Sequence, residues 1–85
     1  MYGSYCNLIG PIPKEIGELT NLCFLHLFTN HLNGTIPASM RFLLELELLQ
    51  LAHNELTGEI PAFLGDMKGL EFIGLDNNQV QLLLS

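Results

Sequence analysis

The chain has 85 residues, of which 48% are hydrophobic and 14% charged, and its formal net charge is −6. This length allows one small domain, and so apolar a chain must pack rather than stay disordered. The acidic excess argues against a nucleic-acid or anionic-membrane partner, because both require a basic surface. No apolar run reaches about 18 residues, so no membrane span is expected. Residues 1–10 also lack the basic and apolar segments of a secretory signal.

A repeat with a period of 24 organises the whole chain. Its clearest markers are Asn30, Asn54 and Asn78, whose numbers differ by 24 from one to the next. Glycine, isoleucine, proline and leucine positions keep the same spacing. They are Gly10, Gly34 and Gly58; Ile12, Ile36 and Ile60; Pro13, Pro37 and Pro61; Leu22, Leu46 and Leu70; Leu25, Leu49 and Ile73; and Leu27, Leu51 and Leu75. Self-similarity at such a period predicts a stack of short repeated units.

The register divides residues 1–85 into one domain of about three and a half repeats. Residues 22–45 and 46–69 are complete units, residues 1–21 are the rear part of an earlier unit, and residues 70–85 are the front part of a later one with a tail. The match ends after Val80. Since no unit buries its leucines alone, we expect neighbouring coils to stack.

Each unit begins with a predicted short strand, because Leu25 and Leu27 alternate as they do in a strand with one buried face. The apolar segment Met40–Ala52 could also be a helix, but the register places a strand near Glu47–Ala52. The asparagine after each strand can bond the backbone of the turn, which predicts a buried asparagine ladder. The glycine that follows permits unusual backbone angles, and the proline ends regular structure.

The two cysteines have separate places in the repeat. Cys6 precedes Asn30 by one full period and so takes the ladder position of the first unit. Cys23 stands at the start of the following strand. A strand of about six residues separates the two ends by roughly 20 Å, whereas a disulfide requires Cα atoms within about 7 Å. We therefore expect no bond between them.

The segment Asn54–Gly65, which reads NELTGEIPAFLG, resembles the plant-specific class of leucine-rich repeats. That resemblance covers essentially the whole chain. It implies an α/β solenoid with short parallel strands on the concave side and turns, 3-10 helices and irregular segments on the convex side. Such repeats form the ectodomains of plant receptor-like kinases and receptor-like proteins, and polygalacturonase-inhibiting proteins. The resemblance also implies an extracellular or plasma-membrane surface location.

Several residues depart from that family pattern. Arg41 and Phe42 replace the usual glycine and polar residue, while Leu82 and Ser85 stand where glycine and proline are expected. The cysteine-paired caps and the many additional units of such ectodomains are not visible, and no kinase signature follows. We expect apolar residues to be exposed at the end coils, causing marginal stability or end-to-end self-association. They are Leu8, Ile12, Ile16, Val80, Leu82, Leu83 and Leu84.

The non-leucine strand residues should line the binding face for a protein or peptide ligand, as is usual for such solenoids. Its first row is apolar, with Phe24, Leu48 and Phe72, and exposed aromatic stripes are typical of protein interfaces. The alternative is that these aromatics simply pack against one another. The expected face comprises Tyr2, Phe24, His26, Phe28, Leu48, Gln50, His53, Phe72 and Asp76. The register puts Ala52 in one of its exposed rows, between Phe28 and Asp76.

No cofactor, metal or catalytic site is expected. His26, His31 and His53 fall in different rows, whereas a metal needs three or four converging ligands. No nucleophile is bracketed by a base and an orienting group. Two other functions remain open: a surface-binding solenoid for ice or cell-wall polysaccharide, and an inhibitor of a secreted enzyme. The former needs a regular repeated array of polar residues, and the rows here vary.

Asn33, Gly34 and Thr35 form a glycosylation sequon in a predicted turn. A glycan on Asn33 is therefore predicted if the chain enters the secretory pathway. Chance occurrence of so short a sequence is the alternative.

Overall fold

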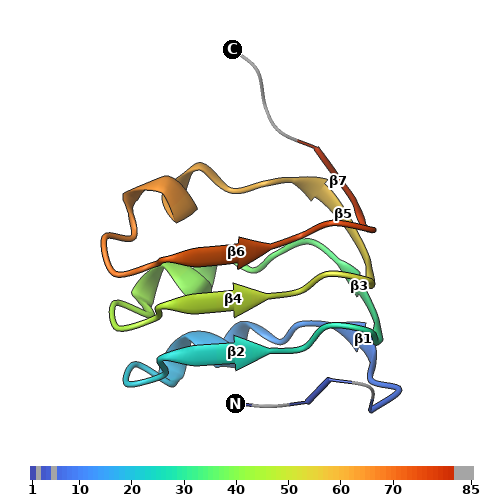
Figure 1. Cartoon of the computed structure of the whole chain (residues 1–85), viewed down its shortest axis with the longest axis horizontal. Coiled ribbons are helices and arrows are strands. Elements are labelled where there is room, and N and C mark those ends of the chain that lie inside the picture. Colours follow the sequence, from blue (N-terminus) through green and yellow to red (C-terminus); the bar gives the residue numbers. More distant parts are fainter. Residues whose placement is uncertain (2, 5, 82–85) are drawn as a thin grey trace.

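The computed structural model describes residue 1, residues 3–4 and residues 6–81. The chain winds into stacked coils, and each complete coil crosses two parallel sheets and one short 3-10 helix (Figure 1). This is the predicted α/β solenoid. The predicted exposure of Leu82, Leu83 and Leu84 lies outside the described residues.

The first sheet contains one strand from each of three coils, β2 (Phe24–His26), β4 (Leu48–Gln50) and β6 (Phe72–Gly74). The strands are parallel in the order β2-β4-β6, and residues one repeat period apart pair with one another. The repeat period therefore sets the register directly. The strand predicted near Glu47–Ala52 is confirmed, and the helical alternative for that segment is wrong.

A second parallel sheet lies beyond the turn that follows the first, where the sequence indicated only turns and irregular segments. Its strands are β1 (Ile9–Pro11), β3 (His31–Gly34), β5 (Glu55–Glu59) and β7 (Gln79–Gln81). Ile9 pairs with His31 and Thr57 pairs with Gln79, a spacing of 22 rather than 24. Since the shift of two positions is even, side chains stay on the same face of the sheet.

Glycines inside this second sheet adopt backbone angles that other residues avoid. Gly10, Gly34 and Gly58 have φ angles of 85°, 73° and 83°. Only glycine reaches this left-handed region without a steric cost from a Cβ atom. The repeated glycine therefore lets the chain bend within the strand while the pairing continues.

Three 3-10 helices return the chain from the second sheet to the first. They are η1 (Lys14–Glu18), η2 (Ala38–Phe42) and η3 (Ala62–Asp66). Each follows a proline of the repeat, at Pro13, Pro37 or Pro61, with φ between −69° and −64° and an extended ψ. The fixed φ of proline suits the residue before a helix, and its missing N–H ends the strand pairing.

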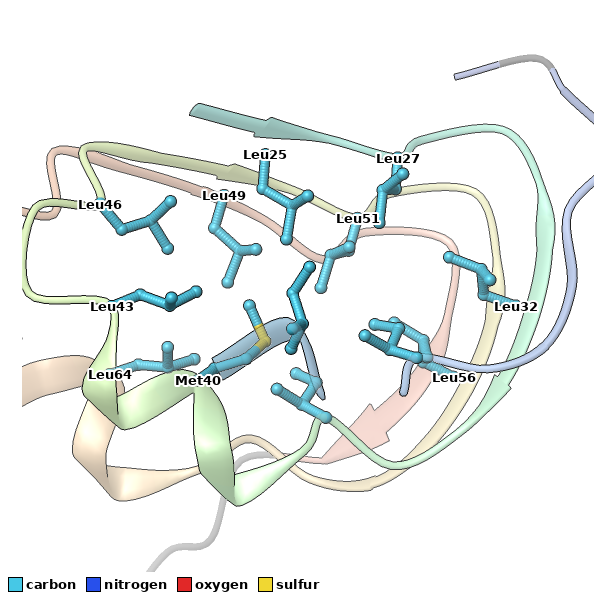
Figure 2. Packing of buried hydrophobic residues seen from close by; sticks show 13 residues of the cluster. Leu25, Leu27, Leu32, Met40, Leu43, Leu46, Leu49, Leu51, Leu56 and Leu64 are labelled. Carbon is cyan, nitrogen blue, oxygen red and sulfur yellow. The ribbon is translucent and has the colours of Figure 1, made fainter. Parts of the chain in front are cut away.

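The hydrophobic core runs through the stack between the sheets and the helices. Figure 2 shows Leu25 and Leu49 of the first sheet facing Met40 of η2 across this core. Ile12 and Ile16 are buried in it, so their predicted exposure at the end coil is wrong; they point inward among residues of the next coil. Leu8 is exposed as predicted, and Val80 is half-buried.

The predicted asparagine ladder is present and binds consecutive coils together. Asn54 Nδ2 donates to the carbonyl oxygens of Leu27 and Leu51, both at 3.0 Å. Asn54 Oδ1 accepts from the backbone N–H of Leu32 at 3.1 Å. One buried side chain thus joins its own strand to two segments of the preceding coil. Asn30 and Asn78 make the corresponding bonds.

Cys6 occupies the ladder position at the start of the stack but is not buried. Its backbone N–H donates to Asn30 Oδ1 at 3.1 Å. The register is confirmed by the bond from the N–H of Leu8 to Asn30 Oδ1, which repeats as Leu32 to Asn54 and Leu56 to Asn78. Its thiol is exposed and points to the carbonyl oxygen of Ser4 at 3.4 Å. Cys6 and Cys23 are both free thiols.

The 3-10 helices do not stack evenly. η1 lies against η2, where the hydroxyl of Ser39 donates to the carbonyl oxygen of Lys14 at 2.6 Å. Gly17 makes this approach feasible, because a Cβ atom there would lie 2.5 Å from the Ser39 carbonyl oxygen. The same position is Arg41 in η2 and Gly65 in η3, and no atom lies within 4 Å of a Cβ placed on Gly65.

Substituting Asn54 with alanine should destabilise the fold by about 1–3 kcal/mol, because the buried N–H of Leu32 loses its partner. The carbonyl oxygens of Leu27 and Leu51 each lose one bond but keep another, from Asn30 and from Asn78. The same change at the exposed Asn21 should stay within about 0.5 kcal/mol. Urea unfolding followed by far-UV circular dichroism measures both. Equal losses in Asn54→Ala and Asn21→Ala would show that the ladder does not hold the coils together.

The two flanking helices provide a matched pair of glycine substitutions. Gly17→Ala should destabilise the fold by about 1–3 kcal/mol, since the new methyl group overlaps the backbone of Ser39. Gly65→Ala meets open space and should be neutral or stabilise by up to about 1 kcal/mol, because alanine restricts the unfolded chain. The same unfolding measurement ranks the two variants, and the reverse order would contradict the unequal packing of the helices.

Candidate ligand-binding face

The outward side chains of β2, β4 and β6, with the residues that follow each strand, form one continuous surface, called the strand face below. Its first row pairs Phe24 with Leu48 and Leu48 with Phe72. Phe24 and Phe72 are 42% and 48% exposed, and Leu48 is half-buried between them. The apolar stripe predicted from the repeat is therefore present at the surface. Its rings remain accessible rather than covered by one another.

The second row is shaped by a contact between two coils. Gln50 pairs with Gly74, and a Cβ atom on Gly74 would overlap the side-chain amide of Gln50. The Gln50 Oε1 accepts from the backbone N–H of Ala52 at 3.1 Å. The glycine therefore provides space for Gln50 to lie along the sheet. This fixed amide borders the apolar stripe.

A shallow depression of about 360 Å³ lies beside these two rows. Ala52 is buried, which makes its predicted exposure wrong. Its small side chain lies between the larger Phe28 and Asp76 of the neighbouring coils, so it lies low in the row they share. The lining residues are Phe28, Thr29, Gln50, Ala52, His53 and Asp76.

The rim of the depression lies at a sharp corner of each coil. Thr29, His53 and Asn77 have φ angles of 57°, in the left-handed region. Each precedes a ladder asparagine, so the corner turns that asparagine inward and leaves the corner residue at the surface. Across this corner, Asn77 Nδ2 and His53 Nε2 lie 3.3 Å apart.

The structure places most of the predicted face on one surface. Phe24, Leu48 and Phe72 form the stripe, and His26 and Gln50 share the second row. The remaining described members of the predicted face line the depression: Phe28, His53 and Asp76. Tyr2 lies outside the described residues. Sequence reasoning missed the low position of Ala52 and the packing of Gln50 over Gly74. The signals available in the sequence were Ala52 and Gly74, which are small residues in rows whose other members are larger.

The histidines do not form a metal site within the described part of the chain, where no group of three metal-ligating side chains converges. His31 Nδ1 lies 3.1 Å from Glu55 Oε2 on the second sheet, away from the strand face. His53 lies at the corner of its coil, and His26 lies within β2. Among the residues that the structure describes, none belongs to a helix long and apolar enough to cross a membrane.

Asn33 lies inside β3 rather than in the predicted turn, because the second sheet extends through this segment. It pairs with Pro11 on one side and Glu55 on the other, and it is exposed. The side chain of Asn33 is therefore accessible for attachment of a glycan, and its glycosylation remains a prediction.

Comparisons with known proteins agree with this architecture. Residues 45–67 match the Leucine Rich Repeat family. The ectodomain of the Arabidopsis thaliana receptor kinase SOBIR1 superposes with a TM-score of 0.88 and 30% identity over 94% of this chain and 43% of that one. The chain is a stretch of plant-type leucine-rich-repeat solenoid. A comparison with curated protein sequences finds no match.

Two ligand-bound receptors are also similar to this leucine-rich-repeat solenoid. One is the ectodomain of the Arabidopsis thaliana plant membrane receptor kinase GASSHO1/SCHENGEN3 in complex with CASPARIAN STRIP INTEGRITY FACTOR 2 (46% identity, TM-score 0.82, 86% of this chain and 9% of that one). The other is the Arabidopsis receptor kinase HAESA with the peptide hormone IDA and the co-receptor SERK1 (39%, 0.80, 85% and 12%). The chain spans less than half of each of these three ectodomains.

Proposed function

We propose that this chain is a non-catalytic recognition module that binds a protein or peptide through its strand face. The observation that carries the proposal is the accessible stripe of Phe24, Leu48 and Phe72 beside the depression around Ala52. A few anchor residues provide most of the free energy of protein association, and aromatic side chains are enriched in such interfaces. Gln50, His53 and Asp76 are among the polar residues that line this depression.

Two further observations support this function. GASSHO1/SCHENGEN3 and HAESA, which are similar to this chain in sequence and fold, are known as complexes with CASPARIAN STRIP INTEGRITY FACTOR 2 and with a peptide hormone, respectively. The strand face is also built on regular strands fixed by the core, so its side chains are held in place before a ligand binds. Such preorganisation reduces the entropy lost on association.

The alternatives receive less support from the geometry. A solenoid that binds ice or cell-wall polysaccharide needs identical polar residues in each row. Here one row runs from His26 through Gln50 to Gly74, so neither size nor chemistry repeats. An inhibitor of a secreted enzyme would use the same strand face as the proposed module, and only the family resemblance favours it.

Self-association of the chain is a second, independent proposal. β1 is an edge strand of its sheet, and Ile9 within it is 79% exposed. An apolar hollow of about 260 Å³ adjoins it, lined in part by Leu8, Pro11 and Leu32. Open strand edges with apolar side chains favour pairing with another chain.

Sedimentation velocity over a wide concentration series should therefore show reversible association. Ile9→Lys should abolish it, because a charged side chain on an edge strand opposes pairing. The matched change at the exposed Thr20, Thr20→Lys, should leave it unchanged. A concentration-independent monomer in the unsubstituted chain would contradict the proposal.

For the strand face, peptides can be selected from a random phage-displayed library on the immobilised chain. The selected peptides should bind the Phe24→Ala/Phe72→Ala double variant about tenfold or more weakly, because truncating two aromatic anchors removes at least about 1.4 kcal/mol. Leu44→Ala, a change on the convex side, should preserve the affinity. Isothermal titration calorimetry measures each pair. Equal affinity of the selected peptides for the double variant and the unsubstituted chain would overturn the proposed role of the stripe.

A further inference from the structure

The convex side holds a further cavity, which is separate from the strand face and larger than the depression there. Its volume is about 490 Å³, and it lies between η2 and η3 with the turns that follow them. The lining residues are Arg41, Phe42, Leu44, Phe63, Asp66, Met67, Lys68 and Gly69. This volume falls within the range of about 300–1,000 Å³ that is typical of ligand-binding sites.

The cavity exists because one coil departs from the pattern of its neighbours. Between η1 and η2, Gly17 lies directly against the backbone of Ser39. The corresponding pair between η2 and η3 is Arg41 and Phe63. An arginine Cβ cannot approach a carbonyl oxygen as a glycine does, and phenylalanine has no hydroxyl to repeat the bond from Ser39 to Lys14. The two helices therefore stay apart and leave the cavity between them.

Apolar side chains line this opening without serving the core. Phe42 is 52% exposed and Leu44 is 78% exposed. In the preceding coil the same positions are Glu18 and Thr20, and in the following coil they are Asp66 and Lys68. Polar residues at these positions are therefore compatible with the fold. Phe42 and Leu44 give only the coil of residues 22–45, called the middle coil below, an apolar surface at these positions, and this surface faces the cavity.

The cavity is also the main basic site of an acidic chain. The chain has three basic residues against nine acidic ones, and two of the three, Arg41 and Lys68, line this cavity. The Arg41 guanidinium lies 4.6 Å from the centre of the Phe42 ring, so charge and aromatic surface are presented together. Asp66 is the one carboxylate in the lining. The local balance thus favours an anionic partner in a molecule that is otherwise negative.

From this juxtaposition we propose that the convex cavity docks a segment of a partner protein that presents an aromatic side chain flanked by carboxylates. A cavity of about 150 Å³ already accepts benzene, so the larger volume here accommodates an aromatic side chain with its backbone. The exposed Leu44 extends the apolar surface beyond the cavity, as expected for a protein contact with a central anchor and a charged rim. This site is independent of the strand face.

The probe is an acetylated, amidated pentapeptide with phenylalanine between two aspartates, titrated into the isotopically labelled chain. Resonances of Met67 and Gly69 should shift saturably, while that of Gly74 on the strand face should not. The asparagine analogue of the peptide should bind at least about tenfold more weakly, and added salt should weaken the aspartate peptide selectively.

Variants separate the two parts of the site. Phe42→Glu/Leu44→Thr gives the middle coil the residues of the coil before it and should abolish the shifts. Arg41→Gln/Lys68→Gln should remove the preference for the aspartate peptide. Phe72→Ala, on the strand face, should bind as the unsubstituted chain does. Because Leu44 is largely exposed, Leu44→Thr alone should fold normally by circular dichroism and still weaken binding.

Three results would overturn the proposal. The first is a set of shifts centred on Gly74 rather than on Met67 and Gly69. The second is equal affinity for the aspartate and asparagine peptides. The third is binding of phenylacetate as tight as that of the peptide, which would identify the cavity as a site for small carboxylic acids. None of these results would affect the proposed role of the strand face, because that role is tested with different residues.

Discussion

The structure depends on the stacking of coils, since a single coil cannot bury its own leucines. Leu43, Leu46 and Leu49, which lie in the two complete units, are fully buried. In the incomplete units at the two ends of the stack, Leu19 (equivalent to Leu43) and Ile73 (equivalent to Leu49) are exposed, because each is packed from one side only among the described residues. Burial here is thus a property of neighbouring pairs of coils, as in other repeat proteins. The asparagine ladder adds direction to this packing: each buried amide fixes where one strand ends relative to the strand before it.

The repeat period was sufficient to predict the first sheet, because its pairing uses that same spacing. The second sheet was not predictable in this way. Its pairing falls two positions short of the period, as for Ile9 with His31, and its strands contain glycines at positive φ and a proline, which favour turns when considered singly. Position in the sequence also failed to predict burial near the first coil. Ile12 and Ile16 lie close to one end of the chain, yet they point into the core because the coil above covers them.

On the strand face, the sequence correctly predicted which residues share a row but not how far each one projects. The period places Phe24, Leu48 and Phe72 side by side, and alternation turns them outward. Whether a side chain stands out depends on its neighbours in the adjacent coils. Gln50 lies flat because Gly74 leaves space beside it, and Ala52 lies low because Phe28 and Asp76 are larger. How far a side chain projects therefore depends on the sizes of all the side chains in its row, and a repeat pattern read one position at a time does not provide these.

The convex cavity follows from the same stacking rule. Positions that face the core are restricted by the coils on both sides, and a change there costs packing in two interfaces. The position of Gly17, Arg41 and Gly65 is restricted only through the separation of adjacent helices, so a larger residue opens the convex side while the sheets stay paired. Arg41 therefore alters the outer surface without disturbing Leu43 or Leu46, which remain buried. In a solenoid of this kind, a departure from the repeat at such a position can create a site on one side while the strand face on the other keeps its regular rows.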